Sequence, residues 1–278
     1  MMALMRVPSD RFLDAALLAD PSGTLLALDF DGTLSHVVAD PARAFAHPES
    51  VAALARLGRR LGAIAVVTGR PVRQARELGG FVGLDGLENL VICGQYGAER
   101  WDASTGQVTE PEPPEAVVQL SDELPRWLAD HGAEQARIED KGLAVAVHVR
   151  GLDPALQVAL EPPLRRLAAE RGLAVEPGRQ VIELRAPGVD KGMALTGLVE
   201  ETGARHVVYA GDDLGDMPAF EAVEAMRRDG GSGFLVCSAS TEQDALVARS
   251  DLVLDGPDAV AQWLTATADA LDGADSAG

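Results

Sequence analysis

Short, almost wholly apolar runs alternate with amphipathic helical stretches along most of this chain, and this alternation limits the possible folds more than any other feature. The runs are LLALDF, AIAVVTG, LVICG, HVVYAGDD, FLVCS and DLVL. Near-continuous apolar strands that alternate with helices indicate a parallel sheet with both faces covered. The sequence therefore predicts an α/β fold built on a Rossmann-like parallel sheet. The helices are expected near residues 48–61, 71–78, 191–203, 215–228, 241–249 and 257–271.

The middle of the chain has a different pattern. Residues 102–115, DASTGQVTEPEPPE, are acidic and rich in proline, which is typical of a junction between domains. A helix near 115–131 then precedes two short strands, and a helix near 153–171 precedes two more. We expect this repeated helix–strand–strand pattern to form a small α+β cap domain inserted into the sheet domain. The expected division is a cap over residues 106–186 and a core formed by residues 1–105 and 187–278.

The composition excludes some classes of partner. A net charge of −19 argues against non-specific binding to nucleic acid or to an anionic membrane. Cys93 and Cys237 each end an apolar run, and we expect both to be reduced core residues. The N-terminal segment has no apolar stretch long enough for a signal peptide, and no segment reaches the roughly 18 apolar residues of a membrane-spanning helix. We therefore expect a cytoplasmic protein, and a monomer.

Two carboxylates stand one residue apart where the first apolar run ends. In LLALDFDGTL, Asp29 and Asp31 are i and i+2, so an extended chain would direct both to the same side. Like charges this close repel each other unless a cation or a shared proton intervenes. A simple turn would also use Asp and Gly here. This stretch alone leaves both a turn and a reactive site open.

A second polar stretch, Thr68-Gly69-Arg70-Pro71, ends another run and opens a helix, with Pro71 suited to the first helical position. A hydroxyl and free backbone N–H groups at a helix start can hold a phosphate. A capped helix start explains Thr68 nearly as well, so the stretch by itself does not decide between the two.

The remaining polar stretches lie late in the chain. Lys191 follows the expected N-cap Asp190, where a cation opposes the helix dipole by ~0.3–1 kcal/mol; this favours an anionic neighbour, although an exposed lysine explains it equally well. Asp212, Asp213 and Asp216 cluster just after the run HVVYA. Such a cluster fits a hard cation with oxygen ligands, and ligands of parallel sheets bind at the carboxyl ends of the strands.

Taken in order, these four stretches resemble the four motifs of the haloacid dehalogenase superfamily of phosphotransferases. The resemblance implies that Asp29 attacks phosphorus to give an aspartyl-phosphate, that Asp31 is the general acid and base, and that Mg²⁺ is the cofactor. The implied metal-binding residues are Asp29, Asp31 (through its backbone carbonyl), Asp212, Asp213 and Asp216. The implied phosphate-binding residues are Thr68, Gly69, Arg70 and Lys191, of which Thr68 and Lys191 also act in catalysis.

Within this superfamily, the Glu-Asp-Lys-Gly segment, the V-I-E-L-R…D-K-G run and DFDGTLSHVVADPARA are similar to the trehalose-6-phosphate phosphatases, from about residue 22 to 265. This implies hydrolysis of trehalose 6-phosphate to trehalose and phosphate, the last step of trehalose biosynthesis, with the cap selecting the sugar. Family members often carry Asn-His-Gly where this chain has Gln95-Tyr96-Gly97. That departure alters the reach of the sugar contacts. The implied substrate-binding residues are Gln95, Tyr96, Glu139, Lys141, His148, Arg150 and Glu183.

Other functions stay open at this point. A sugar phosphomutase would share the core and a related cap, and phosphatases of sucrose phosphate or mannosylglycerate phosphate have caps built alike. A non-catalytic partner of a trehalose-phosphate synthase would be expected to have lost Asp29, Asp31 or Lys191, and all three are present. The charged cap residues could also be solvated edge-strand charges that prevent aggregation.

Overall fold

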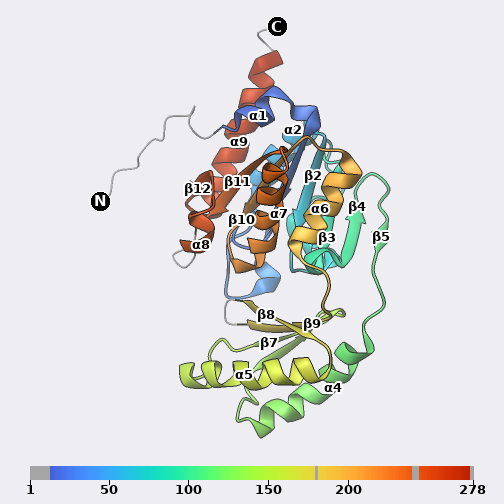
Figure 1. The fold of residues 1–278 in the computed structure, drawn as a ribbon, viewed down its shortest axis with the longest axis vertical. Helices are drawn as coiled ribbons and strands as arrows, with labels where there is room; N and C mark the ends of the chain where they lie inside the picture. The colour runs from blue at the N-terminus through green and yellow to red at the C-terminus, as the bar shows by residue number, and fades with distance from the viewer. Residues whose placement is uncertain (1–12, 179–180, 240–243, 276–278) are drawn as a thin grey trace, which may run out of the picture. The chain divides into compact units, whose positions relative to one another are not determined.

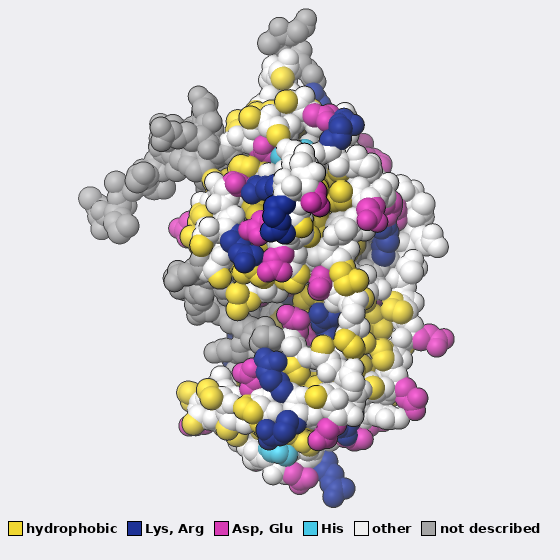
Figure 2. Space-filling model, viewed as in Figure 1, with side chains coloured by type: hydrophobic (Ala, Val, Ile, Leu, Met, Phe, Trp, Pro, Cys, Tyr) yellow, Lys and Arg dark blue, Asp and Glu magenta, His cyan; other side chains and the backbone are white. Residues whose placement is uncertain are grey.

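A computed structural model describes residues 13–178, 181–239 and 244–275 of the chain. The chain divides into two compact units, which we call the core unit (1–109 and 190–278) and the inserted unit (110–189). Figure 1 labels helices and strands of both units. On the face drawn in Figure 2, acidic and basic side chains are interspersed, so the negative net charge is not gathered there into one acidic patch.

The core unit contains the parallel sheet that the apolar runs predict, and the predicted fold class is confirmed. Its strand order is β12-β11-β10-β1-β2-β3-β4-β5. The first six of these strands are parallel, whereas β4 and β5 extend the sheet antiparallel and had not been predicted. The bounds are β1 Thr24–Leu28, β2 Ala63–Val67, β3 Leu90–Gly94, β4 Glu99–Asp102, β5 Val108–Thr109, β10 His206–Gly211, β11 Ser232–Ser238 and β12 Leu252–Leu254.

Helices cover both faces of this sheet, which explains why its central strands are apolar throughout. Along β1, Leu26 and Leu28 belong to one core cluster, whereas Leu25 and Ala27 belong to the other. The first cluster includes side chains of α2 (Pro48–Gly58), α3 (Val72–Gly79) and α9 (Gly256–Asp275). The second includes side chains of α6 (Lys191–Thr202) and α7 (Met217–Arg228). Two short helices are α1 (Ala15–Ala19) and α8 (Asp244–Val247); the first residues of the helix expected over 241–249 lie outside the described part of the chain.

The inserted unit has the repeated pattern that the sequence indicates. Helix α4 (Glu115–Asp130) precedes β6 (Arg137–Asp140) and β7 (Ala144–His148), and α5 (Pro154–Glu170) precedes β8 (Ala174–Gly178) and β9 (Val181–Arg185). The four strands form an antiparallel sheet in the order β6-β7-β9-β8. Apolar side chains of both helices and of the strands make one cluster. In the register of the sheet, Ala146 pairs with both Glu139 and Glu183, so the two glutamates share one face.

Two smaller expectations can be checked in the described residues. Cys93 and Cys237 are free and buried, as predicted. No helix in the described ranges is long and apolar enough to cross a membrane.

Candidate active site

Asp29 lies directly after β1, at the carboxyl end of the sheet, and its carboxylate is buried. Its backbone N–H donates to the carbonyl of Ala210 at 2.8 Å, which continues the pairing of β1 with β10 for one more residue. The Lys191 ammonium donates to Asp29 Oδ1 at 2.5 Å and to Asp216 Oδ1 at 2.7 Å. Burial raises the pKa of Asp29, and the charge of Lys191 opposes that rise.

Lys191 reaches these carboxylates because α6 begins at this residue. Asp190 is the N-cap of α6, as predicted, and its carboxylate accepts the N–H of Met193 at 2.8 Å. Burial disfavours the charge on Lys191, but Asp216 and Asp29 outweigh burial and raise the pKa of Lys191 well above its usual value. The unfavourable position of a cation in a first helical turn is therefore explained by an anionic neighbour rather than by exposure.

Asp216 is fully enclosed, and both of its carboxylate oxygens are occupied by donors. Besides Lys191, the hydroxyl of Tyr209 donates to Oδ1 at 2.7 Å. The backbone N–H groups of Asp212 and Asp213 donate to Oδ2 at 2.9 and 3.2 Å. With four donors in place, Asp216 is suited to holding Lys191 and the loop after β10 in position.

Asp212 is in a different situation from Asp216. Among the residues that the structure describes, none donates a hydrogen bond to the Asp212 carboxylate. Burial, together with the charges of Asp29, Asp216 and Asp213, raises the pKa of Asp212 to about 10. Repulsion of this size would be relieved by a cation next to the carboxylate.

The buried acidic cluster has the donor set of a divalent cation site. One oxygen each of Asp29, Asp212 and Asp216 lies within 4.8 Å of the others, and hard divalent cations prefer carboxylate oxygens. The Gly32 backbone lies directly against the Asp212 carboxylate. A Cβ on Gly32 would be 2.0 Å from Asp212 Oδ2, and the φ of Gly32, +80°, is a left-handed value that favours glycine. Asp213 caps the short 3₁₀ turn Leu214–Asp216, where it accepts the N–H of Gly215 at 2.8 Å.

Asp31 is paired with Arg70. The Arg70 guanidinium donates to both Asp31 oxygens, with Nε and Nη2 each at 2.6 Å. The guanidinium is itself fixed by the Pro41 carbonyl at 3.0 Å from Nη1 and by the Phe30 ring, whose centroid is 5.5 Å away. Bidentate pairs of this kind fix the direction of a carboxylate. The structure thus places the Arg70 side chain on Asp31, whereas the sequence had associated it with phosphate.

The second motif forms a tight loop after β2. Thr68 is buried, its N–H donates to the Cys93 carbonyl at 2.9 Å, and its Oγ1 accepts the N–H of Arg70 at 3.1 Å. Helix α3 begins at Val72, one residue later than expected, because Pro71 has an extended ψ of 143°. The hydroxyl and the loop N–H groups nevertheless lie at a helix start, the position that favours an oxyanion.

The turn after β3 carries the two residues in which the chain departs from the family pattern. Gln95 is buried and Tyr96 is partly buried, and both have positive φ values, 47° and 62°. A Cβ placed on Gly69 would be 2.9 Å from Tyr96 Cζ and Oη. The phenol ring therefore packs directly on the loop that contains Thr68.

The inserted unit brings its predicted residues together in two groups. The Lys141 ammonium pairs with the buried Glu183 carboxylate. Glu139 accepts a hydrogen bond from His148 at 2.7 Å, and that bond is the main cause that lowers the pKa of Glu139 to about 2. Arg150 is exposed just beyond β7. Glu139, His148 and Glu183 lie on β6, β7 and β9, whereas Lys141 directly follows the end of β6.

Three residues of the core site had not been predicted. Tyr209 lies in the wholly buried strand β10, and a buried tyrosine hydroxyl requires a partner, so the sequence offered a signal for it. Ser238 Oγ donates to the Gly32 carbonyl at 2.6 Å and holds the loop after β1. Glu99 is buried and accepts hydrogen bonds from Val72 and Gln95. No sequence pattern marks Ser238 or Glu99, because Ser238 binds Gly32 and Glu99 binds Val72, both distant in the chain.

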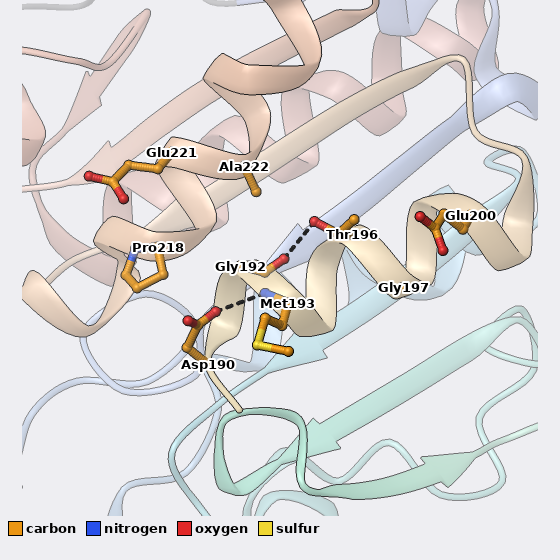
Figure 3. Close-up of a pocket in the computed structure, with 9 residues that line it drawn as sticks. All are labelled: Asp190, Gly192, Met193, Thr196, Gly197, Glu200, Pro218, Glu221 and Ala222. Atoms are coloured by element: carbon orange, nitrogen blue, oxygen red, sulfur yellow. Dashed lines mark hydrogen bonds between the residues drawn. The ribbon is translucent and has the colours of Figure 1, made fainter. Parts of the chain in front are cut away.

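A separate groove of about 450 Å³ lies between α6 and α7 (Figure 3). Asp190, Pro218 and the exposed Met193 line one part of it. Gly197 and Glu200 line it farther along α6. The groove does not include the buried acidic cluster.

Comparison with known proteins identifies the family. The family model described as trehalose-phosphatase matches residues 27–252. A probable trehalose-phosphate phosphatase of Sinorhizobium fredii is 32% identical over 217 residues, covering 76% of this chain and 78% of that protein. An uncharacterised glycosyl hydrolase of Mycobacterium tuberculosis is 36% identical over 207 residues, covering 70% of this chain but only 15% of that much longer protein.

Solved structures share the fold. The C-terminal domain of the C. albicans trehalose-6-phosphate phosphatase aligns with a TM-score of 0.73 at 20% identity, covering 92% of this chain and 97% of that one. A haloacid dehalogenase-like hydrolase from Bacteroides thetaiotaomicron aligns at 0.60 with 18% identity, covering 87% and 98%. At these identities the likeness shows that this chain shares its fold with both proteins. With most of its length matched by the family model, the chain belongs to the trehalose-phosphatase family.

Proposed function

We propose that this protein hydrolyses trehalose 6-phosphate to trehalose and inorganic phosphate through an aspartyl-phosphate. Membership of the family supports the substrate, together with the named activity of the Sinorhizobium relative. The observation that carries the chemistry is the buried Asp29 carboxylate, which is bound by Lys191 at 2.5 Å beside the Asp212 carboxylate. A carboxylate held in this way is oriented for attack on an anionic group.

In the proposed first step, an Asp29 oxygen forms a bond to phosphorus and the bond from phosphorus to the sugar oxygen breaks. Asp31 gives its proton to the departing sugar oxygen. In the second step, Asp31 takes a proton from a water molecule, whose oxygen attacks phosphorus and releases Asp29 and inorganic phosphate. Lys191 and the Thr68 hydroxyl hold phosphoryl oxygens and stabilise the charge that moves onto them.

Arg70 is proposed to orient Asp31 through its bidentate pair, while the loop of Thr68 and Gly69 supplies the phosphate contacts. The guanidinium cannot lose its proton, so it holds the ionised form of Asp31 between the two steps. In the first step Asp31 must carry a proton to act as an acid, so the Arg70–Asp31 hydrogen bonds must loosen before that step. The exposed fraction of the Asp31 side chain, 39%, gives it access to solvent and substrate.

The divalent metal is proposed to be Mg²⁺. Asp29 and Asp212 would hold it with their carboxylates and Asp31 with its backbone carbonyl, while Asp213 and Asp216 support the loop. When bound, the ion neutralises phosphate charge and relieves the repulsion between the carboxylates.

The inserted unit is proposed to bind the sugar hydroxyls, because charged partners make the stronger hydrogen bonds. The residues proposed for this are Glu139, Lys141, His148, Arg150 and Glu183. We retain the expectation of a cytoplasmic monomer as a proposal.

Phosphate release with Mg²⁺ from a small panel tests this function. The panel contains trehalose 6-phosphate, sucrose 6-phosphate, glucose 6-phosphate, mannose 6-phosphate and an aryl phosphate. A strong preference in kcat/KM for trehalose 6-phosphate is expected. Activity on the aryl phosphate without such a preference would keep the phosphatase and discard the substrate. Release from none of them would favour a phosphomutase or a non-catalytic protein.

A further inference from the structure

The turn after β3 has an unusual backbone. Gln95 and Tyr96 are consecutive, neither is glycine, and both adopt left-handed φ values, 47° and 62°. Side chains with a Cβ disfavour this region, and such residues persist only when the surrounding structure holds them there. Two in succession at the carboxyl end of a central strand require an identifiable restraint.

The restraint includes four hydrogen bonds that link the turn and Glu99 to the Thr68 loop and to the start of α3. The backbone N–H of Gln95 donates to the Arg70 carbonyl and that of Tyr96 to the Thr68 carbonyl, both at 2.9 Å. The Gln95 side-chain amide donates to Glu99 Oε1 at 2.8 Å, and the N–H of Val72 donates to Glu99 Oε2 at 2.6 Å. Glu99, only 7% exposed, thus joins the strained turn to the first residue of α3.

The turn determines where the Tyr96 ring lies. Gly69 has no side chain, and a Cβ there would meet Tyr96 Cζ and Oη at 2.9 Å. On another side, a Cβ on Gly215 would lie 3.9 Å from Tyr96 Cε1. The phenol ring therefore lies between the Thr68 loop and the loop of the acidic cluster, next to the position where the phosphate of a substrate would bind.

We propose that Glu99 is a positioning residue that sets the selectivity of this enzyme for sugar phosphates by fixing Tyr96. Each Glu99 oxygen accepts a hydrogen bond from a different segment. One oxygen accepts the side-chain amide of Gln95 in the turn, and the other accepts the N–H of Val72, where α3 begins after the Thr68 loop. Without both acceptors the turn can relax toward a common backbone conformation, and the ring moves off Gly69. The inference rests on the proposed function, because it takes the ligand beside Tyr96 to be a sugar phosphate.

The test compares Glu99→Ala, Tyr96→Ala and the double variant. The readout is the selectivity, defined as kcat/KM for trehalose 6-phosphate divided by kcat/KM for an aryl phosphate. We expect each single variant to lower the selectivity about tenfold and the double variant to lower it about tenfold as well, since residues that act as a unit are not additive. Glu99→Gln keeps an oxygen that can accept the Val72 N–H, and its NH2 can donate to the Gln95 amide oxygen once that amide turns over, so this variant should stay within about threefold of the natural protein.

Asp14→Ala is the matched control. Asp14 is also a buried carboxylate at a helix start, where it accepts the N–H of Ala16 at 2.9 Å, but it pairs with His206 at the amino end of β10. Its loss should lower the melting temperature without changing the selectivity. A merely structural role for Glu99 would give the same result.

Three outcomes overturn the proposal. The first is an equal loss on both substrates in Glu99→Ala, the second is a roughly hundredfold loss of selectivity in the double variant, and the third is a Glu99→Gln variant as impaired as Glu99→Ala. Failure of the proposed function would show differently, as a natural protein that does not prefer trehalose 6-phosphate. The same ratio, measured on whichever sugar phosphate it prefers, would still test Glu99.

Discussion

Replacing Lys191 by Met tests the electrostatic design of the site most directly. Lys191 lies 2.5 Å from one carboxylate and 2.7 Å from another, and the side chains of Lys191, Asp29 and Asp216 are 4%, 6% and 0% exposed. Methionine has a similar volume, so little of the effect comes from a cavity. The variant leaves two buried carboxylates without their shared cation. Breaking a buried ion pair from one side costs about 3–5 kcal/mol of folding free energy, and we expect a loss of that size when divalent ions are absent.

A divalent ion should reduce the loss of folding free energy in Lys191→Met. An ion that binds only the folded protein stabilises it by about 2.7 kcal/mol at one hundred times its Kd. In the variant Asp29 has lost the Lys191 ammonium, so the ion should bind more tightly than in the natural protein. The difference in unfolding free energy between the two proteins should therefore shrink when Mg²⁺ replaces EDTA. Phosphatase activity should be lost in either condition.

The assay is urea unfolding followed by tryptophan fluorescence. A Trp127→Phe background removes the tryptophan of the inserted unit, so Trp101 and Trp263 report on the core unit alone. Arg249→Met is the control, since the Arg249 side chain is 38% exposed and its guanidinium lies 3.5 Å from both Glu221 and Glu224, exposed pairs that are expected to contribute less than about 1 kcal/mol. A Lys191→Met deficit no larger than that of the control would refute the electrostatic reasoning, and a deficit unchanged by Mg²⁺ would refute the metal site.

Four further results are expected. Asp29→Asn should abolish turnover while the melting temperature is retained; substantial residual phosphate release would remove Asp29 as the nucleophile. Complete chelation should stop the reaction of the natural protein, and undiminished activity would contradict the divalent ion. Lys141→Ala should reduce kcat/KM for a disaccharide phosphate far more than for an aryl phosphate, and equal losses would make Lys141 structural. Glu139→Gln should destabilise the protein by about 1–2 kcal/mol at pH 6, because His148 lowers the pKa of Glu139 to about 2. This contribution to the free energy of unfolding is present above pH 4.5 and falls as the pH drops toward 2. An equal difference in unfolding free energy between variant and natural protein at pH 6 and pH 3 would contradict it.

The sheet and the location of the site were predictable for the same physical reason. A strand buried on both faces must be apolar along its whole length, so the runs in the sequence identify the central strands. The polar residue that follows each run then lies at the carboxyl edge of the sheet, and for this reason the sequence alone could bring Asp29, Thr68 and Asp212 together. The antiparallel strands β4 and β5 lack such runs, and β5 is only two residues long, so no sequence pattern predicted them.

The roles within the site were less predictable, because they depend on loops. Arg70 follows Thr68-Gly69 in the sequence, and the resemblance to the superfamily implied a phosphate contact for it. Its side chain instead reaches Asp31, 39 residues away, because the Pro41 carbonyl and the Phe30 ring hold the guanidinium there. In the same way, the hydrogen bond from Val72 to Glu99 joins residues 27 apart. Spacing in the sequence contains no information about such pairs.

The acidic cluster can be understood by asking which countercharge each carboxylate has. The Lys191 ammonium donates hydrogen bonds to Asp29 and Asp216. Asp216 also accepts hydrogen bonds from the Tyr209 hydroxyl and from two backbone N–H groups. Asp212 alone among these three accepts no hydrogen bond from the described residues, and burial together with the neighbouring carboxylates raises its pKa to about 10. The protein therefore neutralises two of the three charges itself and leaves the third for an ion. On this reasoning Asp212→Asn should be the substitution that relieves repulsion, and so stabilises the ion-free protein, while weakening binding of the divalent cation. A variant that is less stable without the ion would show that Asp212 has a countercharge within the protein after all.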